Sequence, residues 1–367
     1  MNQPDSPSAP GERTAPGASS SDCFRRMPKV ELHLHLEGAI PLPCLWDLMG
    51  KYGGDPAVPD LAALARRFRF RDFPHFIATW AWKNRFLREY EDFTRIAAAV
   101  AEDLASQNVL YAEAFYSPQS FGERGLEPQG ITAAVRRGLD REPAVDIALI
   151  ADLVRDRDPR EGQRTVDALA EVRAVCRVAG IGLGGSEHLF PPQLFAPIFE
   201  HARQLGFRTT AHAGEACGPE SVWEALRSLR VDRLGHATRA IEDPALVDFL
   251  AQERIPLELC VISNLRTGVI PSPELHPART YFERGIPLSI NTDDPTLFNN
   301  SLAEEYSLLR DRLGFNQPDI HELIDQAAQS SWLPDNRREA LRKRLREDRG
   351  GPAAGEGGST DKGKRTA

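Results

Sequence analysis

The stretch VELHLHLEG at residues 30–38 alternates apolar and polar side chains, as a β-strand with two different faces does. Its leucines share one face, and the other face carries His33, His35 and Glu37. In a barrel strand the leucines would contact the surrounding helices and the histidines would point inward. Two buried imidazoles need hydrogen bonds or a metal ion, and H-x-H on a strand aims both rings at one point. The pair alone leaves both interpretations open.

Short apolar runs alternate with helix-periodic stretches along the rest of the chain. Strands are predicted at 30–36, 109–115, 146–153, 180–184, 208–213, 233–236, 256–261 and 287–291. Helices between them are predicted at 90–106, 162–179, 191–205, 221–229 and 244–253, among others. Eight strand–helix units in about 300 residues predict an α/β protein with a (β/α)8 TIM barrel. An open doubly wound sheet is the alternative, but it favours a G-x-G-x-x-G turn after the first strand, and none is present there.

The segment 41–88 interrupts this alternation and is rich in Phe and Trp. It is too long and too apolar for a loop, so we expect extra helices that either cap the barrel mouth or pack against its side. Residues 1–25 are rich in Pro, Ser and Gly, and 350–367 are Gly-rich and charged, which predicts a disordered tail at each end. One barrel domain would then occupy 26–349.

The composition narrows the class of protein. Among 367 residues, 41% are hydrophobic and 27% are charged, which excludes a wholly disordered chain. No apolar run approaches the roughly 20 residues of a membrane-spanning helix. The net charge of −8 argues against a general nucleic-acid partner. Five scattered cysteines without a C-x-x-C pair are typical of a reduced compartment, so we expect a cytoplasmic protein with neither a membrane nor a nucleic-acid partner.

Three further motifs fall at predicted strand ends. TAHAGE places His212 next to Glu215, a metal ligand beside a proton carrier. RLGH ends with His236, and SINTDDP contains Asp293 and Asp294. Each motif also has an ordinary interpretation: a solvated glutamate, a hydrogen-bonded histidine, or acids that cap the next helix.

The joint placement of the four motifs is more specific than any one of them. All lie at the carboxyl ends of the first, fifth, sixth and eighth predicted strands. In a closed barrel the eighth strand lies beside the first, so Asp293 comes close to His33 and His35, and His212 faces them across the mouth. Three histidines and one aspartate then predict a site for one zinc ion, with room left for water.

The chain resembles the adenosine deaminase family of zinc-dependent aminohydrolases. The matching stretches are ELHLHLEGAI, HAGEACGPESVW, RLGHA, LELCVISNLRTGVI with the following HP, and INTDDP, which span residues 29–328 in the family's order. The resemblance implies a (β/α)8 barrel with one zinc at its mouth. It implies that the zinc ligands are His33, His35, His212 and Asp293.

The same resemblance implies a reaction: hydrolytic deamination of a 6-aminopurine nucleoside, adenosine or adenosine-like, to the inosine-type product and ammonia. Glu215 would give a proton to the purine ring, and His236 would orient and deprotonate the water. Asp294 would contact the water and the ring's N7, and the backbone of Gly185 would contact N3. Zinc would lower the pKa of water towards about 7, and burial would raise the pKa of Glu215.

One position bears on the substrate. Glu37 stands where adenosine deaminases usually have the Asp that helps to hold the ribose. Glutamate there is more typical of relatives that act on other 6-aminopurines, so adenine deaminase and aminodeoxyfutalosine deaminase (an enzyme of menaquinone biosynthesis) are alternatives. The substrate-binding residues would be Gly185, His35, Glu37 and Asp294.

Two hypotheses from other classes stay open. One is another amidohydrolase reaction, such as amide or ester hydrolysis, because H-x-H is shared by that wider class. The other is a non-catalytic protein that binds a metal or a nucleoside. Such a protein would be expected to lack Glu215, His236 or Asp294, and all three are present.

Overall fold

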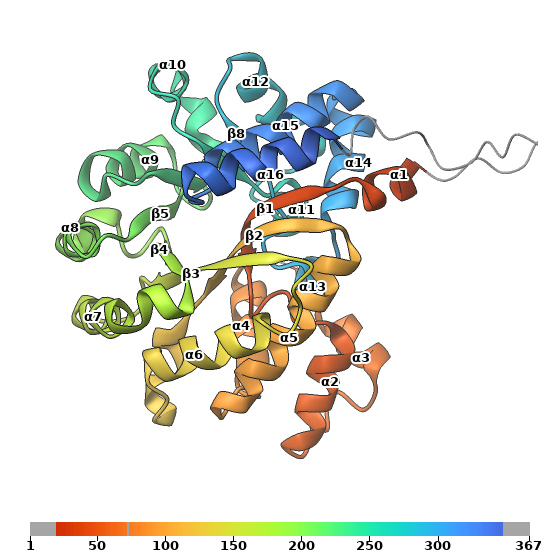
Figure 1. Ribbon diagram of the computed structural model, residues 1–367, viewed down its shortest axis with the longest axis vertical. Helices are drawn as coiled ribbons and strands as arrows, with labels where there is room; N and C mark the ends of the chain where they lie inside the picture. Colours follow the sequence, from red (N-terminus) through yellow and green to blue (C-terminus); the bar gives the residue numbers. More distant parts are fainter. Residues whose placement is uncertain (1–19, 72, 348–367) are drawn as a thin grey trace, which may run out of the picture.

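Eight parallel strands form the barrel predicted from the sequence (Figure 1). The computed structural model describes residues 20–71 and 73–347. The strands follow chain order around the barrel, and the ends of the sheet meet where His35 N–H donates to the Asp293 carbonyl at 2.7 Å and Asp293 N–H donates to the His33 carbonyl at 3.1 Å. The strands are β1 (Lys29–His35), β2 (Val109–Tyr116), β3 (Asp146–Val154), β4 (Val178–Gly184), β5 (Arg208–Ala213), β6 (Arg233–His236), β7 (Leu257–Leu259) and β8 (Leu288–Ile290).

Helices surround the strands, and α6 to α10 follow one another around the outside of the barrel (Figure 1). The α-helices are α1 (Ser20–Arg26), α2 (Leu42–Lys51), α3 (Leu61–Arg67), α4 (Phe73–Asn84), α5 (Tyr90–Ser106), α6 (Pro128–Leu139), α7 (Pro159–Cys176), α8 (Ala196–Gln204), α9 (Pro219–Glu224), α10 (Pro244–Gln252), α11 (Val261–Arg266), α12 (Ala278–Glu283), α13 (Pro295–Phe298), α14 (Leu302–Leu313), α15 (Gln317–Ser330) and α16 (Asp335–Glu347). Short helical turns are η1 (Pro118–Arg124), η2 (Pro192–Phe195), η3 (Ala225–Leu229), η4 (Thr238–Glu242) and η5 (Pro273–Leu275). None of the helices in the described residues combines the length and hydropathy of a membrane span.

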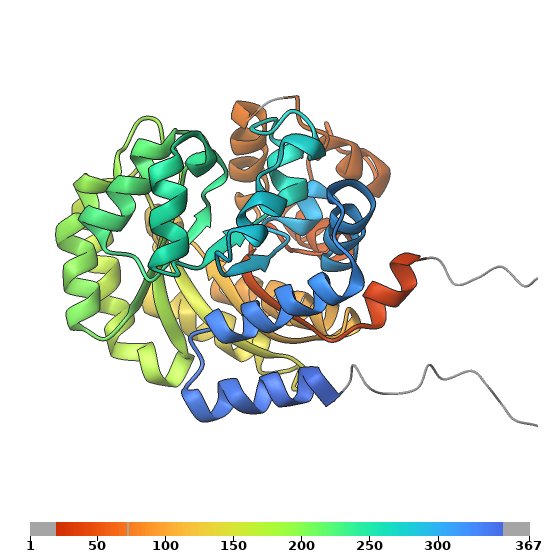
Figure 2. The ribbon, with the colours of Figure 1, turned by 90° about the horizontal axis from the view of Figure 1, so that it is seen from above.

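The N-terminal part of the chain differs from the predicted tail. Residues 20–25 belong to α1, which packs beside α14, whereas residues 1–19 and 350–367 lie outside the described residues. Phe24 is buried, and its ring lies edge-on to that of Tyr306 at 6.0 Å between centroids. Lys29 donates to the carbonyls of Phe24 and Arg25, both at 2.9 Å, and so ties the end of α1 to β1. Phe24 and Lys29 therefore anchor a helix that composition alone does not indicate. Figure 2 shows α1 leaving the barrel beside the blue C-terminal helices.

Two predicted strands are longer than the observed ones. The prediction 256–261 shortens to β7, because the chain enters α11 at Val261, and 287–291 shortens to β8. Asn291 follows β8: its backbone N–H still donates to the Leu259 carbonyl of β7 at 2.9 Å, and its side-chain oxygen accepts the backbone N–H groups of Leu32, at 2.8 Å, and His33, at 3.2 Å. This contact joins the end of β8 to β1 directly beneath the barrel mouth.

The aromatic segment 41–88 occupies both of the places expected for it. It forms α2, α3 and α4. Helix α2 contacts α3 and α5 at the side of the barrel, whereas Phe76, Trp80 and Asn84 of α4 line a cavity at the mouth. The segment therefore both packs against the side of the barrel and caps its mouth.

Candidate active site

Four candidate ligands meet at the carboxyl end of the barrel. His33 and His35 come from β1, His212 from β5 and Asp293 from the turn after β8, and their ligand atoms lie within 4.8 Å of one another. Nε2 of His212 is 3.1 Å from Nε2 of His33 and 3.1 Å from Nε2 of His35. Oδ1 of Asp293 is 3.4 Å from Nε2 of His35 and 3.7 Å from that of His33. All four side chains are buried.

Hydrogen bonds decide which ring nitrogens carry lone pairs. Nδ1 of His212 lies 3.2 Å from the Leu183 carbonyl, which can only accept, so Nδ1 carries the proton and Nε2 does not. Nδ1 of His33 donates in the same way to the Glu258 carboxylate at 2.8 Å. The two Nε2 atoms therefore face each other with lone pairs at 3.1 Å and cannot hydrogen-bond to each other. A cation bound between the two Nε2 atoms would remove the repulsion between their lone pairs.

The donor set suits zinc. Burial lowers the pKa of His33, His35 and His212 well below the usual imidazole value, which keeps the rings in the neutral form that binds metals. Three imidazole nitrogens and a carboxylate oxygen, without sulfur, form a common zinc ligand set. The residues present therefore fit the metal that the sequence motifs imply.

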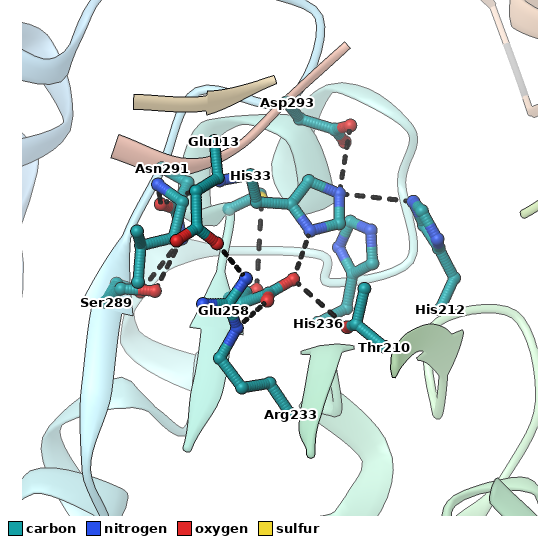
Figure 3. Close-up of polar contacts among 12 residues, drawn as sticks. His33, Glu113, Thr210, His212, Arg233, His236, Glu258, Ser289, Asn291 and Asp293 are labelled. Carbon is teal, nitrogen blue, oxygen red and sulfur yellow. Dashed lines mark hydrogen bonds and ion pairs between the residues drawn. The ribbon is translucent and has the colours of Figure 1, made fainter. Parts of the chain in front are cut away.

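A buried network of charges lies beneath His33 (Figure 3). Arg233 donates through Nε to Glu258 at 2.6 Å and through a terminal nitrogen to Glu113 at 2.5 Å. Tyr111 donates to the other oxygen of Glu113 at 2.8 Å. A carboxylate on the far nitrogen of a ligating histidine fixes the ring's tautomer and direction. Sequence reasoning missed this network, although acids inside the apolar runs of β2 and β7 were a visible signal.

Glu215 lies at the barrel mouth, in the turn that follows β5. Its Oε2 is 3.6 Å from Nε2 of His236. Burial and, to a lesser degree, the charge of Glu187 raise the pKa of Glu215 to about 8, while Arg155 opposes the shift. The carboxyl group is therefore mostly protonated at neutral pH, as an acid for a heterocycle must be.

Glu187 holds the turn that presents Glu215. Its Oε1 accepts the backbone N–H of Gly214 at 2.6 Å, and its Oε2 accepts those of Glu215, Ala216 and Cys217 at 3.2, 2.7 and 3.0 Å. One buried carboxylate thus satisfies four successive backbone donors. Sequence reasoning did not single out Glu187.

A chain of hydrogen bonds fixes the tautomer of His236. The backbone N–H of Ala278 donates to Nδ1 of His276 at 3.2 Å, so Nε2 of His276 donates to Oδ1 of Asn264 at 3.3 Å. The Asn264 amide then donates to Nδ1 of His236 at 3.2 Å. Nε2 of His236 consequently carries a proton, and it has no hydrogen-bond partner among the described residues. This N–H group can therefore donate a hydrogen bond to an acceptor in the cavity.

Asp294 and Glu37 are buried close to a lysine that the sequence analysis did not single out. Burial and the neighbouring Asp293 raise the pKa of Asp294 well above its usual value, and its Oδ1 has no partner within the described part of the chain. Burial lowers the pKa of Lys83 to about 8, and the charges of Glu37 and Asp294 oppose that shift. Glu37 accepts the Ser117 N–H at 2.9 Å, but it is not among the residues that line the cavity.

A cavity of about 610 Å³ opens above this cluster. Gly185 lines it with a φ of 94°, in the left-handed region that favours glycine. Asp152 of β3 lines it as well, and its Oδ1 has no partner among the described residues. A Cβ on Gly182 or Gly184 would lie 2.6 or 2.3 Å from that carboxyl group, so the glycines of β4 make room for it. The remaining lining includes His35, Trp80, His212, Glu215, His236, Asp293, Asp294 and Phe298.

Comparisons with known proteins agree with this geometry. A family model described as "Adenosine deaminase" matches residues 28–348. The chain is 35% identical over 326 residues to an adenine deaminase of Streptomyces coelicolor, covering 88% of this chain and 95% of that protein. It is 33% identical over 313 residues to an aminodeoxyfutalosine deaminase of Streptomyces avermitilis, covering 84% and 87%. A solved amidohydrolase of Burkholderia ambifaria with bound Zn superimposes with a TM-score of 0.82 at 30% identity, covering 90% of this chain and 93% of the other.

Proposed function

We propose that this chain converts a 6-aminopurine nucleoside to the inosine-type product and ammonia, with zinc as its metal. The premise is that the chain belongs to the adenosine deaminase family and is a hydrolytic deaminase. The observation that carries the proposal is the placement of Glu215, whose pKa burial raises to about 8, beside His236 and the cluster of His33, His35, His212 and Asp293 in one cavity. An acid, a metal site and room for a purine coincide there.

His33, His35, His212 and Asp293 would hold the metal. When bound, a zinc ion supplies Lewis acidity, which lowers the pKa of a water molecule towards neutrality. The Glu258 carboxylate fixes His33, and the Leu183 carbonyl fixes His212, so that both rings present lone pairs to one point.

The other residues act on the purine. Glu215 gives a proton to ring N1, which weakens the aromaticity of the ring and makes the carbon that bears the amine electrophilic. Water adds to that carbon, one of its protons goes to the amine, and the other returns to the Glu215 carboxylate. The C–N bond then breaks and ammonia leaves, so a 6-aminopurine and water yield a 6-oxopurine, which keeps the proton on N1, and ammonia. Asp294, whose pKa is raised by burial and by Asp293, contacts N7, and the backbone of Gly185 contacts N3.

His236 orients the incoming oxygen by donating through Nε2. The relay from Ala278 favours this orienting part of its expected role over the deprotonating part. To accept a proton at Nε2, the ring would need its other proton on Nδ1. That arrangement would turn the Asn264 amide around and set a His276 proton against the Ala278 N–H.

The substitution Glu215→Gln tests the proposal. General acid catalysis contributes about 10²- to 10⁴-fold, so kcat should fall by that range while the metal content stays near one ion per chain. Glu253→Gln, at an exposed glutamate at the end of α10, is the matched control and should change neither quantity. Equal ammonia release by Glu215→Gln and wild-type protein would refute the assigned role.

The relatives favour two other purine substrates, adenine and aminodeoxyfutalosine. A panel of adenine, adenosine, methylthioadenosine and aminodeoxyfutalosine, each followed by the ultraviolet change on loss of the 6-amino group, separates these candidates. Activity on none of them by the metal-loaded protein would remove the proposed reaction.

A further inference from the structure

The cavity extends beyond the purine site to a rim that carries four charged side chains. Glu123 and Arg124 come from η1 after β2, and Asp156 and Arg157 come from the loop after β3. The reacting edge of the purine points at the metal cluster on the floor, so the substituent at N9 must extend towards the mouth. This rim is therefore where the part of the substrate farthest from the base would lie.

Two of these four charges are already matched. Arg157 lies 3.2 Å from the Glu123 carboxylate, and the two charges cancel. Asp156 accepts the backbone N–H of Ser186 at 2.9 Å and its hydroxyl at 2.5 Å, which fixes the loop beside Gly185. Both donors to Asp156 are neutral, so this carboxylate keeps its negative charge beside Gly185.

Arg124 carries the other unmatched charge of the rim, and it is the positive one. One terminal nitrogen donates to the carbonyls of Asn84 and Leu87, both at 2.7 Å, which holds the side chain against the end of α4. Among the described residues no carboxylate lies within ion-pair distance of its guanidinium. Burial and the nearby charge of Arg88 lower the pKa of Arg124, and the charge of Glu123 opposes this shift. The guanidinium carbon also lies 5.4 Å from the centre of the Phe121 ring. A guanidinium offers five N–H donors, and two carbonyl contacts through one nitrogen do not exhaust them.

We propose that Arg124 forms a subsite for an anionic group on the substrate, so that the substrate class is a 6-aminopurine nucleoside with a carboxylate or phosphate tail rather than adenine or adenosine. This inference rests on the proposed deamination, because the purine must lie on the cavity floor for its tail to reach the rim. Arginine suits carboxylate and phosphate alike because both accept two parallel N–H bonds.

The experiment compares kcat/KM for four substrates: adenine, adenosine, adenosine monophosphate and aminodeoxyfutalosine. The last two carry a phosphate and a carboxylate and so distinguish the two anions. At least one of them should exceed adenosine by roughly 10- to 100-fold, the range that a charge-assisted hydrogen bond supplies. The substitution Arg124→Gln should lower the ratio of that anionic substrate to adenosine by the same factor, and Arg124→Lys should recover part of it.

Arg160→Gln is the matched control. Arg160 is an exposed arginine paired with Asp158, does not line the cavity, and should leave the ratio unchanged. A preference for adenine or adenosine, or a ratio that does not respond to Arg124→Gln, would overturn the inference and leave the proposed reaction standing. If no substrate is deaminated, the proposed reaction fails. Calorimetry then tests the subsite by comparing the affinities of the protein for adenosine monophosphate and for adenosine. Equal affinities would overturn the inference.

Discussion

The carbonyl of Leu183 decides which nitrogen of His212 is available to a metal. Because a carbonyl only accepts, the proton must sit on Nδ1, and the lone pair of Nε2 faces that of His33. The sequence could place both histidines at strand ends, but it could not assign their tautomers. Those depend on Leu183 and Glu258, which are 29 and 225 residues away along the chain.

The charge of Glu187 should affect the pH dependence of kcat/KM. A raised pKa means that Glu215 is protonated below about 8 and loses its proton above it, so kcat/KM should decline as pH rises through about 8. Glu187→Gln removes one cause of the raised pKa, and the decline should move to lower pH. The measurement is kcat/KM against pH at low ionic strength for both proteins. An unmoved or alkaline-shifted decline would show that Glu187 does not tune Glu215.

Among the elements, β6 packs closely against the metal cluster at Gly235. A Cβ on Gly235 would lie 2.9 Å from Cε1 of His33, whose ring is held by Glu258 and cannot swing away. Gly235→Ala should therefore displace His33 and lower both the metal content and kcat. Metal analysis of the purified protein checks this.

Gly50→Ala is the control for that substitution. It lies in α2 with nothing within 4 Å of an added Cβ. Alanine in a helix should stabilise the fold by about 0.5–1 kcal/mol without changing the metal content. Full metal occupancy in Gly235→Ala would contradict the role assigned to the tight approach.

The sequence predicts elements best where local pattern and tertiary contacts agree. The predicted bounds of β5, β6 and α5 match the structure, because their apolar periodicity ends at residues such as Gly214 and Gln107 that begin turns or caps. The predicted helix 191–205 instead divides into η2 and α8, and 221–229 contains the end of α9 and η3. Such divisions depend on packing against neighbouring helices, which periodicity does not report.

The residues that sequence reasoning missed support the predicted ones from other elements. Asn264 and His276 lie within the quoted family motif, yet only their geometry shows that they fix His236. Glu113 could have been noticed as an acid inside an apolar strand. Lys83 and Arg124 carry no local signal, because only the folded chain brings α4 and η1 to the cavity.

Across the whole molecule, Arg233 ties the barrel floor to the C-terminal helices. It bonds to Glu113 and Glu258, and it donates to the Ser330 carbonyl at the end of α15 at 2.9 Å. Arg233→Met would leave two buried carboxylates without a counter-charge. Breaking a buried ion pair in this way costs about 3–5 kcal/mol.

Denaturant unfolding of the metal-free protein measures that loss. Arg160→Met changes an exposed arginine and should stay within about 0.5 kcal/mol of wild type. A free energy of unfolding for Arg233→Met as close to wild type as the control's would show that the network does not stabilise the fold.

The reaction depends on the claim that residues of β1, β5 and the turn after β8 bind one cation together. Anomalous diffraction at the zinc absorption edge, from crystals of protein loaded with zinc, tests it most directly. We expect one peak per chain at about 2.0–2.2 Å from the Nε2 atoms of His33, His35 and His212 and from a carboxylate oxygen of Asp293. A peak elsewhere, or no peak in protein that still releases ammonia from its substrate, would contradict the account.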